Sequence, residues 1–245
     1  MKKIILLLAF CLSVGNLFAQ DANADKLREE GDAAMTAKNY PEVVAKYSEY
    51  LKLTNYEDES RIFNCAFAAY NAKKYDDAIK FYDMAIQKGY KADDAYVGKA
   101  MSLRSQDKAA DFTATVEAGL KANAQNANLE KLLYAYCMKK GQAAQKAGKT
   151  EEAEELSKDV LVVSNAKYKG NALYSLGVMF YNAGAKILAD ANPIATSDPD
   201  KYAAEKKKAD AQMAKAKGYL EQAVALNAAD ANSKKILDAI NAAAK

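Results

Sequence analysis

Small residues recur along the chain at nearly even intervals, each inside a stretch with helical periodicity. They are Gly31, Ala66, Ala100, Gly141 and Gly177, and the steps between them are 35, 34, 41 and 36 residues. A second helix-like stretch follows each one, so the repeating unit is a pair of helices of about 34 residues. Because such a pair cannot bury its apolar face alone, a neighbouring pair must cover it. The spacing predicts an all-α solenoid of stacked helical hairpins, which favours a binding scaffold over an enzyme.

Residues at other fixed points share this phase. If position 1 is the residue seven before each small residue, the repeats begin at Ala24, Glu59, Asp93, Tyr134 and Gly170. Position 4 is then occupied, in repeats one to five, by Leu27, Ile62, Tyr96, Cys137 and Leu173. Position 17 is a tyrosine in the first two repeats, Tyr40 and Tyr75. Position 20 is an alanine in repeats two and four, Ala78 and Ala153. This pattern resembles the tetratricopeptide repeat over nearly all of the chain beyond residue 23. The proline of position 32 is missing throughout, and repeat three departs from the pattern.

The resemblance implies a right-handed α-solenoid of about five helical hairpins plus a C-terminal capping helix at residues 232–243. The repeats would occupy residues 24–57, 59–92, 93–126, 134–167 and 170–230, forming one domain over residues 20–245. Solenoids need such a cap, because the last repeat would otherwise expose its apolar face.

Two departures from the period predict longer helices. The step of 41 residues adds seven, about two helical turns, so we expect one long helix over residues 128–147. Repeat five holds a larger insertion, which includes Pro193 and Pro199. We expect it to lengthen both helices of that repeat into a helical hairpin over residues 184–210, with a loop from about Asn192 to Asp200.

The first nineteen residues have the pattern of a cleavable secretory signal. Lys2 and Lys3 precede an apolar stretch from residue 4 to residue 12, and Ala19 supplies the small residue before the cleavage point. The apolar stretch is shorter than the about 20 residues that a membrane-spanning helix needs. We therefore expect cleavage, no integral membrane segment afterwards, and export to a bacterial periplasm or other secreted location.

The charge balance argues against a nucleic-acid partner. Removal of Lys2 and Lys3 from 35 basic and 32 acidic residues leaves 33 against 32, a net charge of +1, without the basic excess of a nucleic-acid-binding face. A lysine-rich run, Lys206 to Lys208, is interleaved with acids and alanines and reads as the solvated face of a helix. Cys65 and Cys137 lie at inward positions of different repeats, so we expect two core thiols and no disulfide.

The residue types that commonly carry catalysis are missing or isolated. The chain has no His, no glycine-rich phosphate loop and no nucleophile elbow around a Ser. The paired acids Asp76-Asp77 and Asp93-Asp94 are placed where helices begin, where acidic side chains suit the helix dipole. We predict no enzymatic activity, no cofactor and no metal site.

An apolar stripe exceeds what the core needs. It uses the family's groove-lining positions in the first helices of repeats two, three and five, and the candidate peptide-binding residues are Phe63, Asn64, Phe67, Tyr70, Val97, Met101, Arg104, Tyr174, Val178 and Tyr181. An exposed apolar patch of this kind marks a binding surface. The alternative is that these side chains pack against the adjoining first helices, and the sequence leaves both open.

One familiar subclass of these repeats binds a C-terminal carboxylate with Lys, Asn and Arg side chains. The corresponding places here hold Arg28, Asp32, Asn64, Asp94 and Gly98. Asn64 alone matches, Arg28 keeps only the charge, and the two aspartates would repel a carboxylate. We predict no such clamp.

The leading hypothesis is an exported scaffold or adaptor that binds a peptide or helix of a cell-envelope protein in its concave groove. A second is a structural component of an envelope complex, docked through the helical hairpin of repeat five. A third is a nutrient-capture helper, which the absence of Trp makes least favoured.

Overall fold

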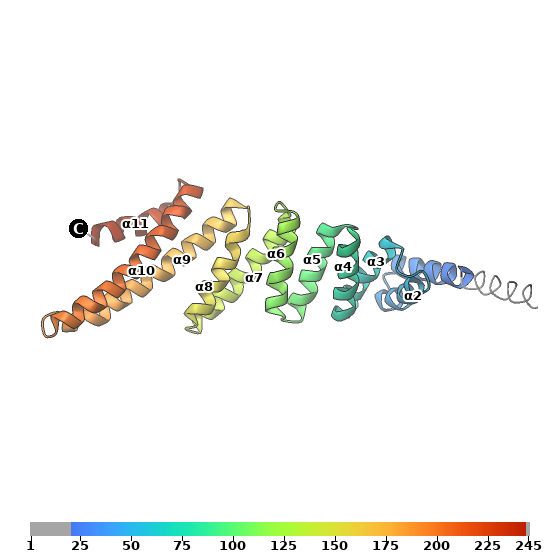
Figure 1. Ribbon diagram of the computed structural model, residues 1–245, viewed down its shortest axis with the longest axis horizontal. Coiled ribbons are helices and arrows are strands. Elements are labelled where there is room, and N and C mark those ends of the chain that lie inside the picture. Colours follow the sequence, from blue (N-terminus) through green and yellow to red (C-terminus); the bar gives the residue numbers. More distant parts are fainter. Residues whose placement is uncertain (1–20, 244–245) are drawn as a thin grey trace, which may run out of the picture. The chain divides into compact units, whose positions relative to one another are not determined.

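The computed structural model describes residues 21–243, so the predicted signal peptide at residues 1–19 lies outside the described part. Within that part the chain is helical without strands, which confirms the all-α solenoid class (Figure 1). It divides after Gly119 into two compact units, and each is described by itself. The interpretation of residues 20–245 as one domain stays a prediction.

The first unit consists of antiparallel helical pairs joined by short turns. Residues 21–36 form its first described helix. The helices that follow are α2 (Tyr40–Leu53), α3 (Glu59–Asn71), α4 (Tyr75–Lys88), α5 (Ala92–Ser105) and α6 (Ala109–Ala122), whose last residues reach past Gly119.

The second unit has longer helices. They are α7 (Ala127–Lys146), α8 (Thr150–Asp159), the 3-10 turn η1 (Val160–Val162), α9 (Ala166–Ala191), the 3-10 turn η2 (Asn192–Ile194), α10 (Pro199–Leu226) and α11 (Ala231–Ala243). The long helix expected at residues 128–147 is present as α7. The insertion of repeat five lengthens α9 and α10 to 26 and 28 residues, against 14 each for α5 and α6, and they pair lengthwise (Figure 1).

Local sequence signals set several helix ends. The side chain of Asp58 accepts a hydrogen bond from the backbone N–H of Arg61, and Asn126 caps α7 in the same way through Leu129. Asp198 caps α10, whose first residue is Pro199, where the missing N–H costs nothing. Gly89 ends α4 with φ of 71°, a left-handed conformation that favours glycine.

Two of the recurrent glycines lie directly beneath a large side chain of the partner helix. A Cβ added to Gly31 would come within 2.4 Å of the Tyr47 ring, and one added to Gly177 within 2.5 Å of Leu220. Ala66 and Ala100 are fully buried. A Cβ added to Gly141 would have its nearest neighbouring atoms 3.9 Å away, so this glycine is not closely covered. A further close approach, between Gly98 and the Tyr82 ring, joins repeat two to repeat three.

Substitution of two glycines on the same helix tests the close approach. Gly177→Ala should lower the free energy of unfolding by about 1–3 kcal/mol, because its methyl group overpacks against buried Leu220. Gly170→Ala is the matched control, since nothing lies within 4 Å of its added Cβ, and it should stabilise the protein by about 0.5–1 kcal/mol. Urea denaturation measures both, and equal effects of the two changes would contradict the packing.

Candidate functional site

The predicted stripe of the first unit lies on α3 and α5, and the structure separates its aromatic residues into two groups. Phe63 and Tyr70 are half-buried and pack against the core of the unit. Phe67 is 43% exposed and is one of three large apolar side chains in residues 21–243 that are exposed by 40% or more, with Val162 and Leu226. Phe67 is therefore the member of the stripe that is free to contact a partner.

Phe63 acts as a packing residue between helical pairs. Its ring meets the rings of Tyr82 and Tyr90 edge-on, with centroids 5.8 and 6.3 Å apart. The ammonium of Lys91 lies 5.1 Å from the Phe63 centroid, a cation–π distance. These contacts hold the beginning of α5 against α3, and they favour the packing alternative for this residue.

Phe67 is oriented by its neighbours without being covered by them. Tyr40, at the start of α2, meets its ring edge-on at 6.0 Å. The side-chain amide of exposed Asn71 donates to the Phe67 carbonyl oxygen over 2.8 Å. One turn along the same face, Tyr70 lies against Tyr75, with centroids 5.8 Å apart. The result is an ordered aromatic surface over the C-terminal half of α3.

The remaining members in this unit flank that surface. Val97, Met101 and Asn64 are half-buried, and Arg104 is exposed, one turn after Met101 on α5. Within the described chain, the Arg104 guanidinium forms no ion pair. A bound segment would therefore meet apolar surface beside a solvated positive charge.

The predicted residues of the second unit behave differently. Tyr174 and Tyr181 pack against the cluster of Leu176, Phe180 and Leu220, which α11 also covers, and Val178 is half-buried. The packing alternative accounts for both tyrosines. Because α9 belongs to the second unit and α3 and α5 belong to the first, the ten predicted residues are divided between the two units.

The places of the carboxylate clamp are occupied by other interactions. The Asp32 carboxylate accepts hydrogen bonds from Tyr47 at 2.6 Å and from the Arg61 guanidinium at 2.7 and 3.3 Å. Burial alone raises the pKa of Asp32, but the hydrogen bonds from Arg61 and Tyr47 outweigh it and hold the pKa below its ordinary value. At another clamp place, Gly98 lies under the Tyr82 ring and leaves no space for a side chain. These contacts support the prediction that no clamp forms.

Arg61 was not singled out by the sequence. It lies 29 residues after Asp32, in the next repeat, so no local pattern pairs the two residues. The same guanidinium lies 4.0 Å from Asp58, the cap of α3, which also accepts from the Tyr50 hydroxyl at 3.0 Å. The network ties the first helical pair to the second.

The described residues offer little for covalent or metal chemistry. Cys65 and Cys137 are free and buried, and burial raises the pKa of both thiols to about 12, so both stay protonated at neutral pH. Residues 21–243 contain no group of three or more Cys, Asp or Glu side chains placed to hold a metal ion. No helix among them is long and apolar enough to cross a bilayer.

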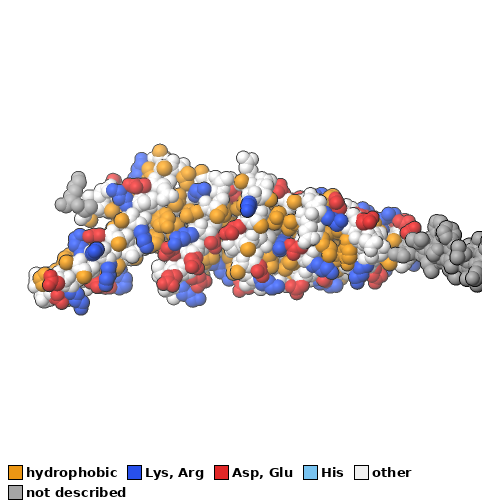
Figure 2. Space-filling view, viewed as in Figure 1, with side chains coloured by type: hydrophobic (Ala, Val, Ile, Leu, Met, Phe, Trp, Pro, Cys, Tyr) orange, Lys and Arg blue, Asp and Glu red, His pale blue; other side chains and the backbone are white. Residues whose placement is uncertain are grey.

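Charged side chains of both signs cover the outer surface of α10 (Figure 2). Lys206 pairs with Asp210 at 2.8 Å, and Lys208 pairs with Glu205 at 2.7 Å. The lysine-rich run is thus a solvated helix face of mixed charge.

Antiparallel helical pairs in both units place the protein in the class of helical-hairpin repeat proteins. The structure superimposes on the crystal structure of a TPR repeats protein from Bacteroides fragilis NCTC 9343 with a TM-score of 0.84 and 44% sequence identity, over 90% of this chain and 98% of that one. The chain belongs to the tetratricopeptide-repeat family, whose members are typically non-enzymatic interaction modules.

A second similarity is to Hsp70-Hsp90 organizing protein 1 of Glycine max, at 30% identity over 154 residues. These residues make up 60% of this chain and 26% of that protein, so the chain spans about a quarter of the length of this curated relative. No family model matches the sequence.

The ion pair of Asp32 gives a pH-dependent prediction. Because the folded state lowers the pKa of Asp32, its ionised form stabilises the fold above the unfolded pKa of about 3.9, and this contribution is lost as the pH falls through the folded value. Asp32→Asn should therefore be less stable than wild type at pH 7, with the difference narrowing below about pH 4. Chemical denaturation across this range measures the difference.

Asp25→Asn is the matched control, since Asp25 is 62% exposed and, among residues 21–243, forms an ion pair only with Arg28 on the surface. It should change stability little at any pH. If the difference in unfolding free energy between wild type and Asp32→Asn stayed constant from pH 7 to pH 3, the assigned ion pair would be contradicted.

Proposed function

We propose that this protein is an exported, non-catalytic adaptor that binds a peptide or helix of another cell-envelope protein on the α3–α5 surface. The observation that carries the proposal is Phe67, an aromatic side chain held in place by Tyr40 yet 43% exposed. An ordered aromatic residue loses little conformational freedom when it is covered, which makes it an effective anchor. Arg104 adds a solvated charge at the edge of this surface.

Export is the part of the proposal that rests on the first nineteen residues. Their charged start, short apolar stretch and Ala19 match a cleavable secretory signal. The partner is then a protein of the cell envelope, met after translocation. We expect micromolar affinity, about 8 kcal/mol, from an aromatic anchor on a modestly preorganised surface.

A matched pair of substitutions tests the binding surface. After crosslinking in the native envelope has identified the bound protein, Phe67→Ala should weaken the affinity of its binding segment by about 1–3 kcal/mol in titration calorimetry, because the exposed anchor is lost. Leu226→Ala removes another exposed apolar side chain, from the second unit, and should leave affinity unchanged. Unfolding of Phe67→Ala at much lower denaturant with binding intact would show that Phe67 is structural.

The paired helices α9 and α10 support a second candidate function, docking into a multiprotein envelope complex. Close packing makes them a defined element: a Cβ added to Gly184 would lie 3.1 Å from the carbonyl oxygen of Ala209. The outer surface of this hairpin carries exposed, mixed charge, so docking through it would use polar contacts (Figure 2).

Replacement of residues 186–208 by a short turn separates the two functions. If the α3–α5 surface is the binding site, the shortened protein should bind the same segment with unchanged affinity and co-purify with the same complex. Size-exclusion chromatography of envelope extracts checks assembly. Retained peptide binding with loss of the complex would assign assembly to the hairpin.

A further inference from the structure

The first unit contains a hollow that the proposed function does not use. It has a volume of about 470 Å³ and lies between α4, α5 and α6. On α5 its lining residues are Tyr96, Lys99 and Leu103, whereas Val97, Met101 and Arg104 belong to the candidate binding surface. These two sets point in directions about a third of a turn apart around the helix. The hollow is therefore a separate surface.

The hollow is an elongated trough. On α4 its lining residues run from Asp76 to Ile86, which lie ten residues apart, a rise of about 15 Å along the helix. The volume falls within the range of about 300–1,000 Å³ typical of ligand sites. A whole helix of this length would not fit, so an occupant would insert side chains from one face.

The two ends of the trough differ in character. At one end, Ile86, Tyr96 and Ala118 form an apolar surface. Ile79 and Leu103 extend that apolar lining along the trough.

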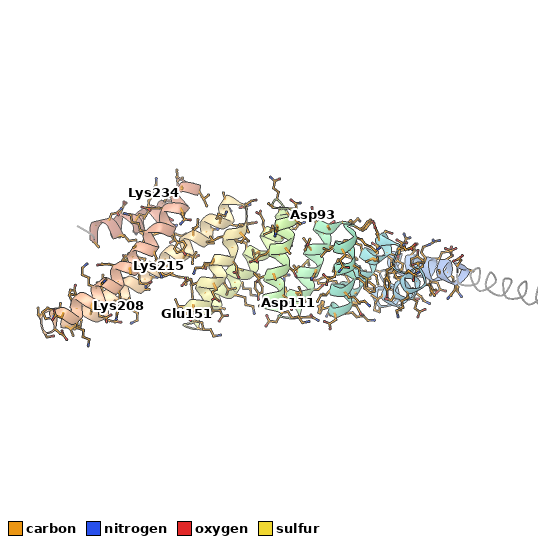
Figure 3. The ribbon with its side chains drawn as sticks, viewed as in Figure 1. Asp93, Asp111, Glu151, Lys208, Lys215 and Lys234 are labelled. Atoms are coloured by element: carbon orange, nitrogen blue, oxygen red, sulfur yellow. The ribbon has the colours of Figure 1, made fainter. Side chains whose placement is uncertain are left out.

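The opposite end carries acids. Lys108 lies 3.4 Å from Asp76, and the side-chain amide of Gln106 also donates to Asp76, over 2.9 Å. Asp111, in the first turn of α6, is labelled on the lower side of the ribbon in Figure 3, and its carboxylate pairs with no cation of the described chain. This end therefore keeps one unneutralised negative charge.

The charge in the middle of the trough is already balanced. The Lys99 ammonium lies 2.7 Å from the Asp83 carboxylate. The trough thus offers an occupant two groups to contact, an apolar surface at one end and, at the other, the Asp111 carboxylate, which is unpaired within residues 21–243.

We propose that this trough is a second docking site, and that its occupant is an amphipathic helix of a partner protein with a large apolar side chain at one position and a Lys or Arg seven residues later. Seven residues rise by about 10.5 Å, the same rise that separates Asp111 at the acidic end from Ala118 at the apolar end along α6. Insertion of one helix face into a groove between helices is an established mode of peptide recognition. The lysine or arginine pairs with Asp111, and the apolar side chain covers Ile86 and Tyr96.

The test uses a displayed library of alanine-rich helical peptides with randomised residues at i, i+3, i+4 and i+7, selected on the full chain. The selected peptides should carry Leu, Ile, Met or Phe at i and Lys or Arg at i+7. Ala114 is exposed and lines the trough, so Ala114→Trp should fill it and abolish binding of the best peptide in titration calorimetry. Asp111→Lys should weaken binding at least tenfold.

Two control variants separate this site from its surroundings. Glu117→Lys reverses an exposed charge of α6 outside the lining and should leave affinity unchanged. Phe67→Ala should also leave the affinity of the peptide unchanged, so the proposal for the trough is tested separately from the proposal for the α3–α5 surface. The circular dichroism spectrum of each variant must match that of the wild type. If Ala114→Trp does not fold, the peptide affinity of Asp111→Lys is the deciding measurement.

Three results would overturn the proposal. The first is that no selected peptide distinguishes wild type from Asp111→Lys or Ala114→Trp. The second is that Phe67→Ala abolishes binding, which would place the peptides on α3. The third is a concentration-dependent dimer that Ala114→Trp dissolves, which would show that a second copy of the chain occupies the trough.

Discussion

The close approach of paired helices, made possible by small residues beneath large ones, is the contact on which the rest of each unit depends. Tyr47 fills the space over Gly31, and Leu220 fills the space over Gly177. Because Tyr47 also donates to Asp32, which pairs with Arg61 of the next helical pair, the same contact fixes the stacking of one pair on another. Stability therefore comes from repeated local interfaces of this kind.

This packing decides which aromatic side chains remain available for recognition. Phe63 belongs to the same interface as Tyr82 and Lys91 and is held by both, whereas Phe67, one turn later, touches Tyr40 and stays open. The proposed interaction surface lies where the core of one pair ends and a single exposed aromatic residue, Phe67, remains beyond it. The trough between α4, α5 and α6 uses other faces of the same helices. One stack of hairpins can in this way carry two independent docking surfaces.

The sequence could predict the helices because their signals are local. The two added turns of α7 and the prolines of the α9–α10 loop each act within a few residues, and the recurrence of Gly31, Ala66 and Gly177 repeats one such local pattern along the chain. The site was less predictable, because a periodic stripe does not distinguish a residue that packs, such as Tyr174, from one that stays exposed, such as Phe67. The Asp32–Arg61 pair and the trough join residues about 30 positions apart, and no local pattern indicates them.

The most direct test of the binding surface is photocrosslinking at Asn71, which is exposed beside Phe67. A benzophenone amino acid at this position, irradiated in living cells, should give one discrete adduct with an envelope protein, and the additional change Phe67→Ala should remove it. The same probe at exposed Lys207 of α10 provides the comparison. Adducts that form only from position 207 and never from position 71 would contradict the account.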